Sequence, residues 1–505
     1  MSKTDKIWKN QLFYGDNLDI LRRIEKDSVD LSYIDPPFNS KRNYNQIYMN
    51  VGQEDRAQAQ AFVDTWSWSS RSNKEIDELV NNYRGLYTER TKNLINGLEK
   101  VLERNSLFAY LVSMTLRIAE IQRVLKPTGC FYLHCDPTAS HYLKLICDSI
   151  FCPKGGDFIN EIIWCYRGGG SSKTDFGKRH DVIFRYSKSK EYKFNADNIR
   201  IPYQAEGIGR TDDAMWGKHK GTDKVYKPNP LGKVPEDWWT MNILNANDPE
   251  RQGYPTQKPE RLLERIIQAS TDEGDVVLDA YCGCGTTIAV AQRIKRKWIG
   301  IDITYHSISL ILKRLSDSFG DKVLESITLS GVPKDFESAE ALANKKDDRV
   351  RKEFEKWCVL TYSDNRAAIN DKKGKDFGID GTASISDRIN GEIMQMPIIF
   401  SVKSDKHPKP SYIRDLIGVM AREKAVLGYF ITLYPPTKDM IDEAHKQGEY
   451  KNELLGIEYS KVKIVTVQEI LDGKQMRLPK SITTEVLKSA PKVEDSGNQM
   501  KLELE

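Results

Sequence analysis

Residues 275–302 read DVVLDAYCGCGTTIAVAQRIKRKWIGID and set the architecture of the larger part of the chain. The apolar run 276–278 predicts a buried strand that ends in Asp279, and 298–301 predicts a second strand that ends in Asp302. A helix is expected between the two strands. This β-α-β order, with an acidic residue about 20 positions beyond the loop, is typical of doubly wound sheets that bind nucleotides.

The loop of this unit carries Gly283 and Gly285, and Thr286 is expected to open the helix. Glycines allow the backbone to approach a ligand closely, and the start of a helix offers free N–H groups. The GCG spacing lacks the GxGxxG of dinucleotide sites, and no lysine follows at the spacing of a phosphate-binding loop. The loop therefore argues against dinucleotides and triphosphates.

A second informative stretch, 31–39, reads LSYIDPPFN and predicts an apolar strand that ends at Asp35, Pro36, Pro37 and Phe38. The prolines remove backbone donors and stiffen the turn. The Asp35 carboxylate and the Pro36 carbonyl are then left as acceptors for an NH2 group, and Phe38 offers a face for stacking. This turn suits a flat ring with an exocyclic amino group. An ordinary strand-ending turn is the alternative.

Together the two stretches resemble the amino-group DNA methyltransferases, which use S-adenosylmethionine. The catalytic motif here precedes the cofactor loop, an order similar to that of the permuted β class of the family. The resemblance covers roughly residues 10–320. It includes the GDN at 15–17, the RVLKPTGCFYLH at 123–134 and the YPTQKPERLLERI at 254–266. Where the family usually has Asp-Pro-Phe, residues 279–281 read DAY, which keeps an aromatic ring.

The resemblance implies an α/β fold with a doubly wound, mostly parallel methyltransferase sheet and an antiparallel edge hairpin. It implies transfer of a methyl group from S-adenosyl-L-methionine to the amino nitrogen of a flipped-out base, with no covalent enzyme intermediate and no metal. The expected catalytic residues are Asp35, Pro36, Pro37 and Phe38. The expected cofactor-binding residues are Asp16, Thr256, Lys258, Asp279, Tyr281, Gly283, Gly285, Thr286 and Asp302.

The tetrapeptide DPPF resembles the adenine-N6 variant of the family more than the cytosine-N4 variant, which more often begins with serine. Adenine N6 is therefore the expected target, and cytosine N4 is the alternative. Two other readings stay open on these residues. One is a DNA-binding protein whose methylase fold has lost activity, and the other is methylation of RNA or of a protein glutamine.

Residues 167–227 are basic, with 14 Lys and Arg against 8 Asp and Glu. In the β class, target recognition lies between the catalytic and cofactor halves, here at about 165–250. Strand-like residues 160–166 and 181–187 are expected to form the antiparallel hairpin, with His180 as a hairpin or phosphate contact. Basic side chains in this region are expected to contact DNA phosphates, a solvated charged loop being the alternative. The expected DNA-binding residues are Arg167, Lys173, Lys178 and Arg179, with Gln204, Arg210, Trp216, Trp238 and Trp239 as candidate base contacts.

Length alone predicts two to three domains, and the change of character after about residue 330 predicts two. Residues 1–330 form the methyltransferase domain, with a catalytic half at 10–190 and a cofactor half at 254–320. The charge-rich segment 331–352 is expected to be a linker or a bridging helix. A smaller α/β domain is expected at 353–480. The last expected region, residues 481–505, is a polar tail.

The second domain resembles the Mrr-like branch of the restriction-endonuclease fold. The resemblance rests on DFGIDG at 376–381 and SVK at 401–403. Active members gather a divalent cation with an aspartate and with a Glu or Gln two residues before a lysine. Asp380 and Lys403 fit this pattern, but Ser401 stands at the Glu/Gln position and is a weaker ligand. A degenerate nuclease is expected, and a bifunctional restriction-modification enzyme is the alternative.

The 505 residues have an ordinary globular composition, with 39% hydrophobic and 29% charged side chains and a net charge of +4. No signal peptide and no 18-residue apolar run are found, so no membrane partner is expected. The eight cysteines show no disulfide or zinc spacing. A cytoplasmic, nucleoid-associated protein of a prokaryote or phage is expected. Double-stranded DNA is the expected partner, and a homodimer and a separate restriction subunit are further partners that the resemblance allows.

Residues 52–105 form a polar insertion in the catalytic half, with helical spacing of apolar residues from 73 to 102. The residues leave three roles open for this insertion: a lid over the DNA, a dimerisation arm, or helices packed against the sheet.

Overall fold

The structure is a computed structural model that describes most of the chain. The described residues are 9–37, 43–46, 49–50, 53–54, 59–63, 68–167, 173–203, 229–245, 247–254, 256–345, 348–370, 378–483 and 490–492. For 43–63 and 348–350 only the backbone is described. Phe38, Gln204, Arg210, Trp216 and most of the expected tail lie outside the described residues. Within the described part, no helix has the length and apolar character needed to cross a membrane.

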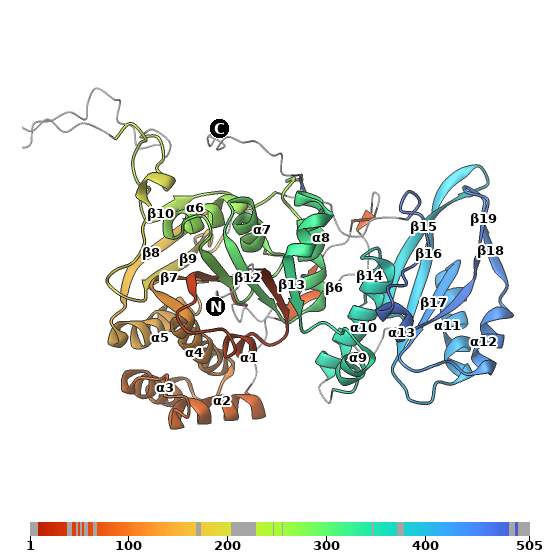
Figure 1. Cartoon of the computed structure of the whole chain (residues 1–505), viewed down its shortest axis with the longest axis horizontal. Helices are drawn as coiled ribbons and strands as arrows, with labels where there is room; N and C mark the ends of the chain where they lie inside the picture. The colour runs from red at the N-terminus through yellow and green to blue at the C-terminus, as the bar shows by residue number, and fades with distance from the viewer. Residues whose placement is uncertain are drawn as a thin grey trace, which may run out of the picture.

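A nine-stranded sheet forms the centre of the first domain, in the order β10-β8-β9-β7-β2-β11-β12-β1-β13 (Figure 1). Its strands are β1 Asn10–Tyr14, β2 Val29–Ile34, β7 Leu125–Cys135, β8 Asp157–Cys165, β9 His180–Ser187, β10 Trp238–Thr240, β11 Val276–Asp279, β12 Lys297–Asp302 and β13 Ile327–Ser330. β9 runs antiparallel to both of its neighbours, and the other described neighbouring pairs in this sheet are parallel. The expected doubly wound sheet with an antiparallel hairpin is confirmed, with the short β10 lying outside that hairpin.

The central strand β2 shows why the sheet forms in this way. All six of its residues are buried, as expected for a parallel strand that is covered on both faces. Leu31 and Tyr33 belong to one apolar cluster and Ile34 belongs to the other. The strand lies between β7 and β11, so its carboxyl end opens near the middle of the sheet.

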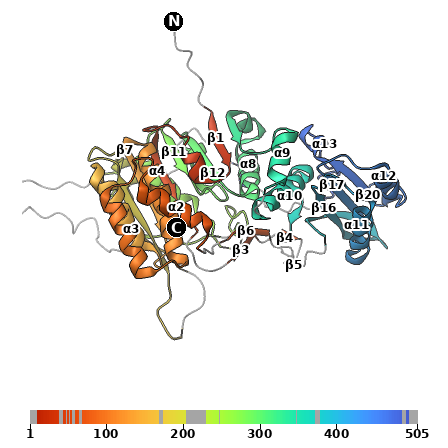
Figure 2. The same ribbon diagram turned by 90° about the horizontal axis from the view of Figure 1, so that it is seen from below.

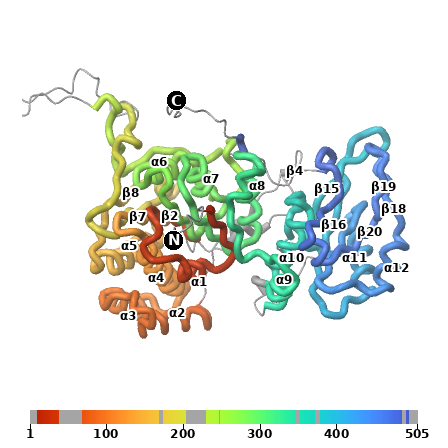
Figure 3. Tube along the Cα trace, viewed as in Figure 1, coloured from red at the N-terminus to blue at the C-terminus, as the bar shows by residue number. Residues whose placement is uncertain are grey.

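Helices cover both faces of the sheet (Figures 1 and 3). On one face lie α1 Asn17–Leu21, α4 Ser106–Val124 and α5 Ser140–Phe151, and on the other lie α6 Glu260–Ser270, α7 Thr286–Arg293 and α8 Tyr305–Phe319. The insertion forms α2 Ser70–Asn81 and α3 Glu89–Leu102. These two helices pack on α4 and α5. One tie between the layers is the Thr91 hydroxyl, which donates to the Ser149 carbonyl at 3.0 Å.

In the described part of the chain, four short strands lie between β2 and α2. They are β3 Asn43–Gln46, β4 Met49–Asn50, β5 Gln53–Glu54 and β6 Ala59–Val63. β3 pairs with β6 and β4 pairs with β5, both antiparallel (Figure 2).

The second domain is built on a five-stranded sheet in the order β14-β15-β16-β17-β20. Its strands are β14 Ala368–Ile369, β15 Gly381–Ile389, β16 Glu392–Lys403, β17 Leu427–Thr432 and β20 Val462–Thr466, with a separate hairpin of β18 Glu449–Asn452 and β19 Ile457–Ser460. Its helices are α10 Asp348–Ser363, α11 Pro410–Glu423, α12 Lys438–His445 and α13 Val467–Leu471. This smaller α/β unit confirms the expected second fold.

The charge-rich segment 331–352 is largely helical. Helix α9, Phe336–Ala343, starts with a capping box in which Asp335 and Ser338 exchange hydrogen bonds, and α10 begins soon after it. Ala339 on α9 is fully buried. The segment therefore packs as part of the fold.

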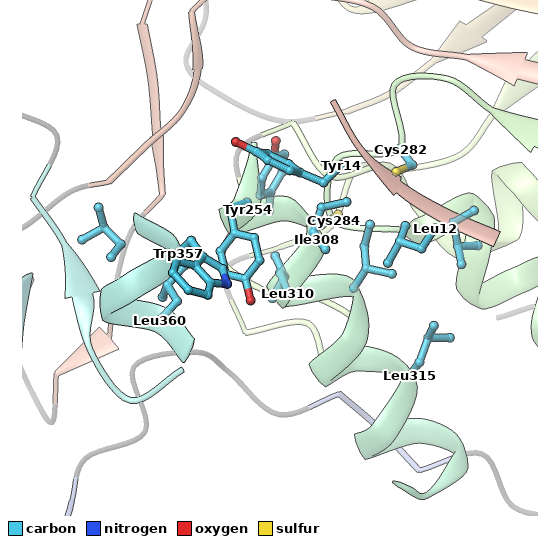
Figure 4. Packing of buried hydrophobic residues seen from close by; sticks show 14 of the residues in the cluster. Leu12, Tyr14, Tyr254, Cys282, Cys284, Ile308, Leu310, Leu315, Trp357 and Leu360 are labelled. Carbon is cyan, nitrogen blue, oxygen red and sulfur yellow. The ribbon is translucent and has the colours of Figure 1, made fainter. Parts of the chain in front are cut away.

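The two domains share one apolar cluster at the α8–α10 contact. Trp357 of α10 is in the same cluster as Leu310 of α8 (Figure 4). The Glu353 carboxylate accepts a hydrogen bond from the backbone N–H of Tyr305 at 2.7 Å, in the first turn of α8. The Tyr305 hydroxyl lies 3.0 Å from the hydroxyl of Thr361. Polar and apolar contacts thus fix the second domain to the helix that follows β12.

Candidate active site

The parallel strands bring the expected site residues to one edge of the sheet. The carboxyl ends of neighbouring parallel strands meet at one edge, which is where sheets of this kind bind ligands. β2 ends before Asp35, β11 ends at Asp279 and β12 ends at Asp302. Asp16 follows β1, whose last residue is paired with Asp302. Four carboxylates that are far apart in the sequence thus face one region.

One oxygen of the Asp35 carboxylate accepts a hydrogen bond, and the other has no donor among the described residues. The Lys258 ammonium group, from the segment that precedes α6, donates to Asp35 Oδ2 at 2.5 Å. Asp35 Oδ1 is buried, and no described residue forms a hydrogen bond with it. Burying an acceptor without a donor is unfavourable, so this atom is suited to a donor supplied by a ligand. Pro36 and Pro37 follow Asp35 directly in the turn.

The glycines of the loop after β11 have backbone conformations that other residues rarely adopt. Gly283 has φ +48° and Gly285 has φ +76°. A Cβ atom on Gly285 would lie 2.7 Å from Cγ1 of Ile311, so the loop has no room for a side chain there. Gly285 is also the residue that precedes α7, whose first residue is Thr286. This geometry places the start of the helix against the loop.

Asp302 is held by backbone and hydroxyl donors. Its Oδ2 accepts from the Gly283 N–H at 3.0 Å, and its Oδ1 accepts from the N–H and hydroxyl of Thr304 at 2.9 and 3.0 Å. Burial raises the pKa of Asp302 to about 6, although these hydrogen bonds oppose the shift. Asp302 is therefore a carboxylate fixed in orientation at the end of β12.

Asp279 is more deeply buried than Asp302, with 3% of its surface exposed. Burial raises the pKa of Asp279 to about 7, and the neighbouring charges of Asp35 and Asp302 add to the rise. Its Oδ1 accepts from the Tyr281 N–H at 3.0 Å. A ligand with hydroxyl donors or a positive charge would favour the ionised form of these carboxylates.

Asp16 is paired with two arginines. It accepts from Arg71 at 2.6 Å and from Arg117 at 3.3 Å, and it caps α1 through the Leu18 N–H. Burial would raise the pKa of Asp16, but Arg117 and Arg71 hold it below its ordinary value. The next residue, Asn17, donates to the carbonyl of Ala280 at 2.9 Å and so ties this loop to the loop after β11.

The other expected cofactor residues lie around the same loops. Thr256 is exposed, has φ +62°, and its carbonyl lies 3.5 Å from the Lys258 ammonium group. The Tyr281 hydroxyl donates to the sulfur of Met114 at 3.4 Å. Lys258 was expected beside the cofactor, and the structure shows it bound to Asp35.

Sequence reasoning missed a chain of polar residues beside Asp35. The Tyr33 hydroxyl lies 2.9 Å from His134 Nδ1, and His134 Nε2 lies 3.1 Å from an Asp181 oxygen. His134 is completely buried. The available signals were the position of Tyr33 two residues before Asp35 and the position of His134 at the end of an apolar strand.

The expected DNA-binding residues lie in the connection between β8 and β9, at the same edge of the sheet. Arg167, Lys173 and Lys178 are exposed, and Arg179 is half-buried. In the same connection Phe176 is 97% exposed, an aromatic side chain that sequence reasoning did not single out. We call these residues the basic surface, which also carries one exposed aromatic ring.

The pair of tryptophans on β10 divides into one surface residue and one core residue. Trp238 is partly exposed and can contact a ligand. Trp239 is buried, and its indole N–H donates to the Glu236 carbonyl at 2.8 Å. The expectation that Trp239 reads a base is therefore wrong, because its ring belongs to the core.

The expected nuclease residues lie together in the second domain. Asp380 Oδ2 accepts from the Val402 N–H at 2.7 Å, which places it against β16 between the positions of Ser401 and Lys403. Sequence reasoning missed Glu355 on α10. Burial and then Asp380 raise the pKa of Glu355 to about 7, and the positive charge of Lys403 opposes the shift.

Lys352 connects the two acidic groups of this second site. Its ammonium group lies 2.9 Å from Glu355 and 3.9 Å from Asp380. Across the described ranges, no group of three or more His, Cys, Asp or Glu side chains is arranged to hold a metal ion. The site thus combines two carboxylates with lysines, and a serine stands where a third polar ligand is expected.

Comparison with known proteins gives one family match in each domain. Residues 29–313 match the protein family described as DNA methylase, and residues 350–470 match the family described as Restriction endonuclease. The chain is 46% identical over 312 residues to the type II methyltransferase M2.LlaDCHI of Lactococcus lactis subsp. cremoris, covering 60% of this chain and 88% of that protein.

Two further relatives cover different shares of their own length. The chain is 30% identical over 306 residues to the DNA adenine methyltransferase YhdJ of Escherichia coli, covering 60% of this chain and 82% of that protein. It is 32% identical over 221 residues to the type II methyltransferase M.BglII of Bacillus subtilis, covering 42% of this chain and 59% of that protein. The DNA methylase match alone takes in more than half of the chain, and three of the four carboxylates, Asp35, Asp279 and Asp302, lie within it. The chain therefore belongs to the S-adenosylmethionine-dependent DNA methylases that modify amino nitrogens.

Proposed function

We propose that this protein transfers a methyl group from S-adenosylmethionine to N6 of adenine in double-stranded DNA. The observation that carries the proposal is that the buried Oδ1 of Asp35 has no hydrogen-bond donor in the part of the chain that the structure describes, whereas Oδ2 already accepts from Lys258. An exocyclic NH2 group is a donor that this acceptor can take. The Pro36 carbonyl is the second acceptor for the same group.

The residues of the turn act by orienting the amino nitrogen. The lone pair of an exocyclic amine is spread into the ring, so the nitrogen is a poor nucleophile. Hydrogen bonds to Asp35 Oδ1 and to the Pro36 carbonyl turn the lone pair out of the ring plane. The negative charge of Asp35 then stabilises the positive charge that develops on the nitrogen.

The carboxylates at the ends of β11 and β12, with the glycine loop between these strands, fit the cofactor. S-adenosylmethionine supplies, when bound, a methyl group on a positively charged sulfur. Asp302 is oriented to accept hydrogen bonds from ribose hydroxyls, and the glycine loop leaves space for the backbone to approach. Asp279 adds negative charge near Asp35, which favours a cationic ligand.

Adenine is the base that we propose, and cytosine is the alternative. Asp35 begins the tetrapeptide, and the adenine-N6 variant of the family more often has an aspartate there. The relative YhdJ is by name an adenine methyltransferase, and its match covers most of its own length. Both observations support adenine N6.

We also propose that the basic surface binds the DNA backbone. Arg167, Lys173 and Lys178 are exposed at the edge that holds Asp35, where phosphates of a bound duplex would lie. A base inside a duplex cannot reach Asp35 and must be flipped out. In this proposal the exposed ring of Phe176 contacts bases beside the flipped one.

Labelling of duplex DNA tests the proposal directly. The protein is incubated with DNA and with S-adenosylmethionine labelled on the methyl group, and the DNA is digested to nucleosides. N6-methyl-2′-deoxyadenosine should carry the label. Label in a cytosine derivative would contradict the choice of base. Unlabelled DNA, with the cofactor still bound, would contradict DNA methylation altogether.

Cofactor affinity should increase with pH. The pKa values of Asp279 and Asp302 are raised to about 7 and about 6, so the free protein holds protons that must leave before both carboxylates accept hydroxyl hydrogen bonds. Between pH 6 and pH 8 a group of pKa 7 goes from about one-tenth to about nine-tenths ionised, so affinity should rise up to about tenfold. Calorimetric titration with S-adenosylhomocysteine measures both the affinity and the protons released.

A matched variant identifies the source of this pH dependence. Asp302→Asn should bind S-adenosylhomocysteine more weakly and with a smaller change of affinity across the same pH range. A wild-type affinity that stays constant from pH 6 to pH 8 would contradict the assignment of the two carboxylates to the cofactor.

We propose that the second domain is a degenerate nuclease that contacts DNA without cutting it. Ser401 replaces the acidic or amide ligand of active members. One observation favours the bifunctional alternative, namely that Glu355 supplies a second carboxylate beside Asp380.

Plasmid DNA should therefore stay uncut by the wild-type protein with magnesium or manganese. The measurement is the loss of supercoiled plasmid over time on a gel. Cutting that disappears in Lys403→Ala and in Glu355→Gln would overturn the proposal and establish a nuclease.

A further inference from the structure

Lys258 carries a positive charge that is paired with the Asp35 carboxylate and also favours the ionised form of Asp181. Its ammonium group donates to Asp35 Oδ2 at 2.5 Å, and the Lys258 side chain is 9% exposed. Burial would raise the pKa of Asp181, but the hydrogen bond from His134 and the charge of Lys258 hold it below its ordinary value. Asp181 is therefore ionised at neutral pH and interacts electrostatically with the same lysine.

The polar chain behind the turn holds Asp181 in place. Burial raises the pKa of Tyr33 well above its ordinary value, so its hydroxyl keeps its proton and can donate to His134 Nδ1. Because Asp181 is ionised, it accepts from His134 Nε2–H. The Tyr166 hydroxyl donates to the other oxygen of Asp181 at 3.3 Å. Both oxygens of this carboxylate thus have donors.

Three neighbouring strands and the ring of Trp164 fix these hydrogen-bonded side chains in space. Tyr33, His134 and Asp181 lie on β2, β7 and β9, which are consecutive in the sheet. The ring of Trp164 meets the His134 ring edge-on at a centroid distance of 5.5 Å, and its indole N–H donates to the Met241 carbonyl. The imidazole therefore has little freedom to rotate.

Charge balance explains what Asp181 adds. Asp35 and Lys258 alone would form a neutral pair, which stabilises a developing positive charge weakly. With Asp181 present the three groups carry one net negative charge, in a region where burial strengthens electrostatic interactions. Lys258 can then hold Asp35 Oδ2 without cancelling the field at the amino nitrogen.

We infer that Lys258 and Asp181, with His134 and Tyr33 behind them, are positioning residues for Asp35. Lys258 fixes the carboxylate so that Oδ1 faces the amino group, and Asp181 offsets the lysine charge. The inference rests on the proposed function, because it assigns Asp35 the amino group of the target base. It gives Lys258 a different role from the cofactor contact expected from the sequence.

Kinetics of single and double variants test the inference on the full chain with duplex DNA. Lys258→Met should lower kcat about a hundredfold and Asp181→Asn about tenfold, with the dissociation constant of S-adenosylhomocysteine unchanged within about twofold. Because Asp181 acts through Lys258, the double variant should be no slower than Lys258→Met alone. Lys258→Arg should recover part of kcat, since the charge is kept.

A buried tyrosine outside the hydrogen-bonded series of Tyr33, His134 and Asp181 gives the matched control. Tyr33→Phe should lower kcat about threefold to tenfold by loosening His134. Tyr132→Phe also removes a buried hydroxyl, which lies 2.9 Å from that of Ser270, and should leave kcat near wild type. Equal kinetic losses in the two variants would indicate a merely structural effect and overturn the inference.

The outcomes separate this inference from the proposed function. Multiplicative losses in the Lys258 and Asp181 double variant, or wild-type kcat in Asp181→Asn, overturn the positioning network while DNA methylation stands. A wild-type protein that methylates no DNA, or an active Asp35→Ala, overturns the proposed function itself.

Discussion

Replacing Asp35 with alanine should reduce methyl transfer to DNA by at least about a thousandfold. The variant loses the acceptor that orients the amino group and the negative charge that stabilises the developing cation. It also leaves the buried Lys258 ammonium group without the partner that it has at 2.5 Å. Cofactor affinity should change little, because Asp35 faces the base. Labelled methyl incorporation and calorimetric binding of S-adenosylhomocysteine measure the two effects separately.

Asp136 provides the control for this experiment. It follows β7 at the same edge of the sheet, and its carboxylate accepts from the N–H and hydroxyl of Thr138 at 3.1 and 3.0 Å. Asp136→Asn should keep methyl transfer within a few-fold of wild type. Asp35→Asn keeps the shape of the side chain but not its charge, and should remain strongly impaired. Activity close to wild type in either Asp35 variant would refute the assigned role.

Gly285→Ala should destabilise the protein by about 2–5 kcal/mol and abolish cofactor binding. Two costs add at this position. A non-glycine residue at φ +76° costs about 1–2 kcal/mol, and the new methyl group overlaps Ile311 Cγ1 at 2.7 Å. The overlap costs a further 1–3 kcal/mol, roughly, because the core has little room to relax. Urea unfolding and calorimetric binding measure the two outcomes.

Gly274 separates these two costs. It has φ +83°, and a Cβ atom there would meet no atom within 4 Å. Gly274→Ala should therefore lose only about 1–2 kcal/mol and keep cofactor affinity. If both glycine variants lose the same stability and both bind the cofactor, the close approach of the loop to α8 has no energetic importance.

The sequence predicted the parts of the site that depend on local patterns. The unit from Asp279 to Asp302 follows from two apolar runs separated by a glycine loop, and each feature acts within a few residues. The turn at Asp35 follows from two prolines after a buried strand. Such patterns reveal which residues reach the edge of the sheet, because strand ends and turns are set by nearby residues.

Pairings between distant segments could not be predicted in this way. Lys258 lies 223 residues from Asp35, and no local pattern indicates that their side chains meet. The same holds for His134 and Asp181, which meet because β7 and β9 are neighbours in the sheet. Trp239 was misjudged because burial depends on the strands around it. Glu355 was missed because a glutamate on a charged helix is usually exposed.

The segment 331–352 was expected to be a linker or a bridging helix, and it contains helix α9. Ala339 on α9 is buried among the charged residues, and Asp335 caps the helix. Charged residues on one face of a helix are compatible with a packed opposite face. The distribution of small apolar residues carried more information than the overall charge.

The contact of Glu353 with the start of α8 bears on how this protein can be divided. A fragment that ended near residue 330 would leave the first turn of α8 without its acceptor and would expose the cluster around Leu310 to water. That helix starts directly after Asp302. The endonuclease-like domain is thus a structural part of the methylase, and the two domains are expected to be kept or lost together.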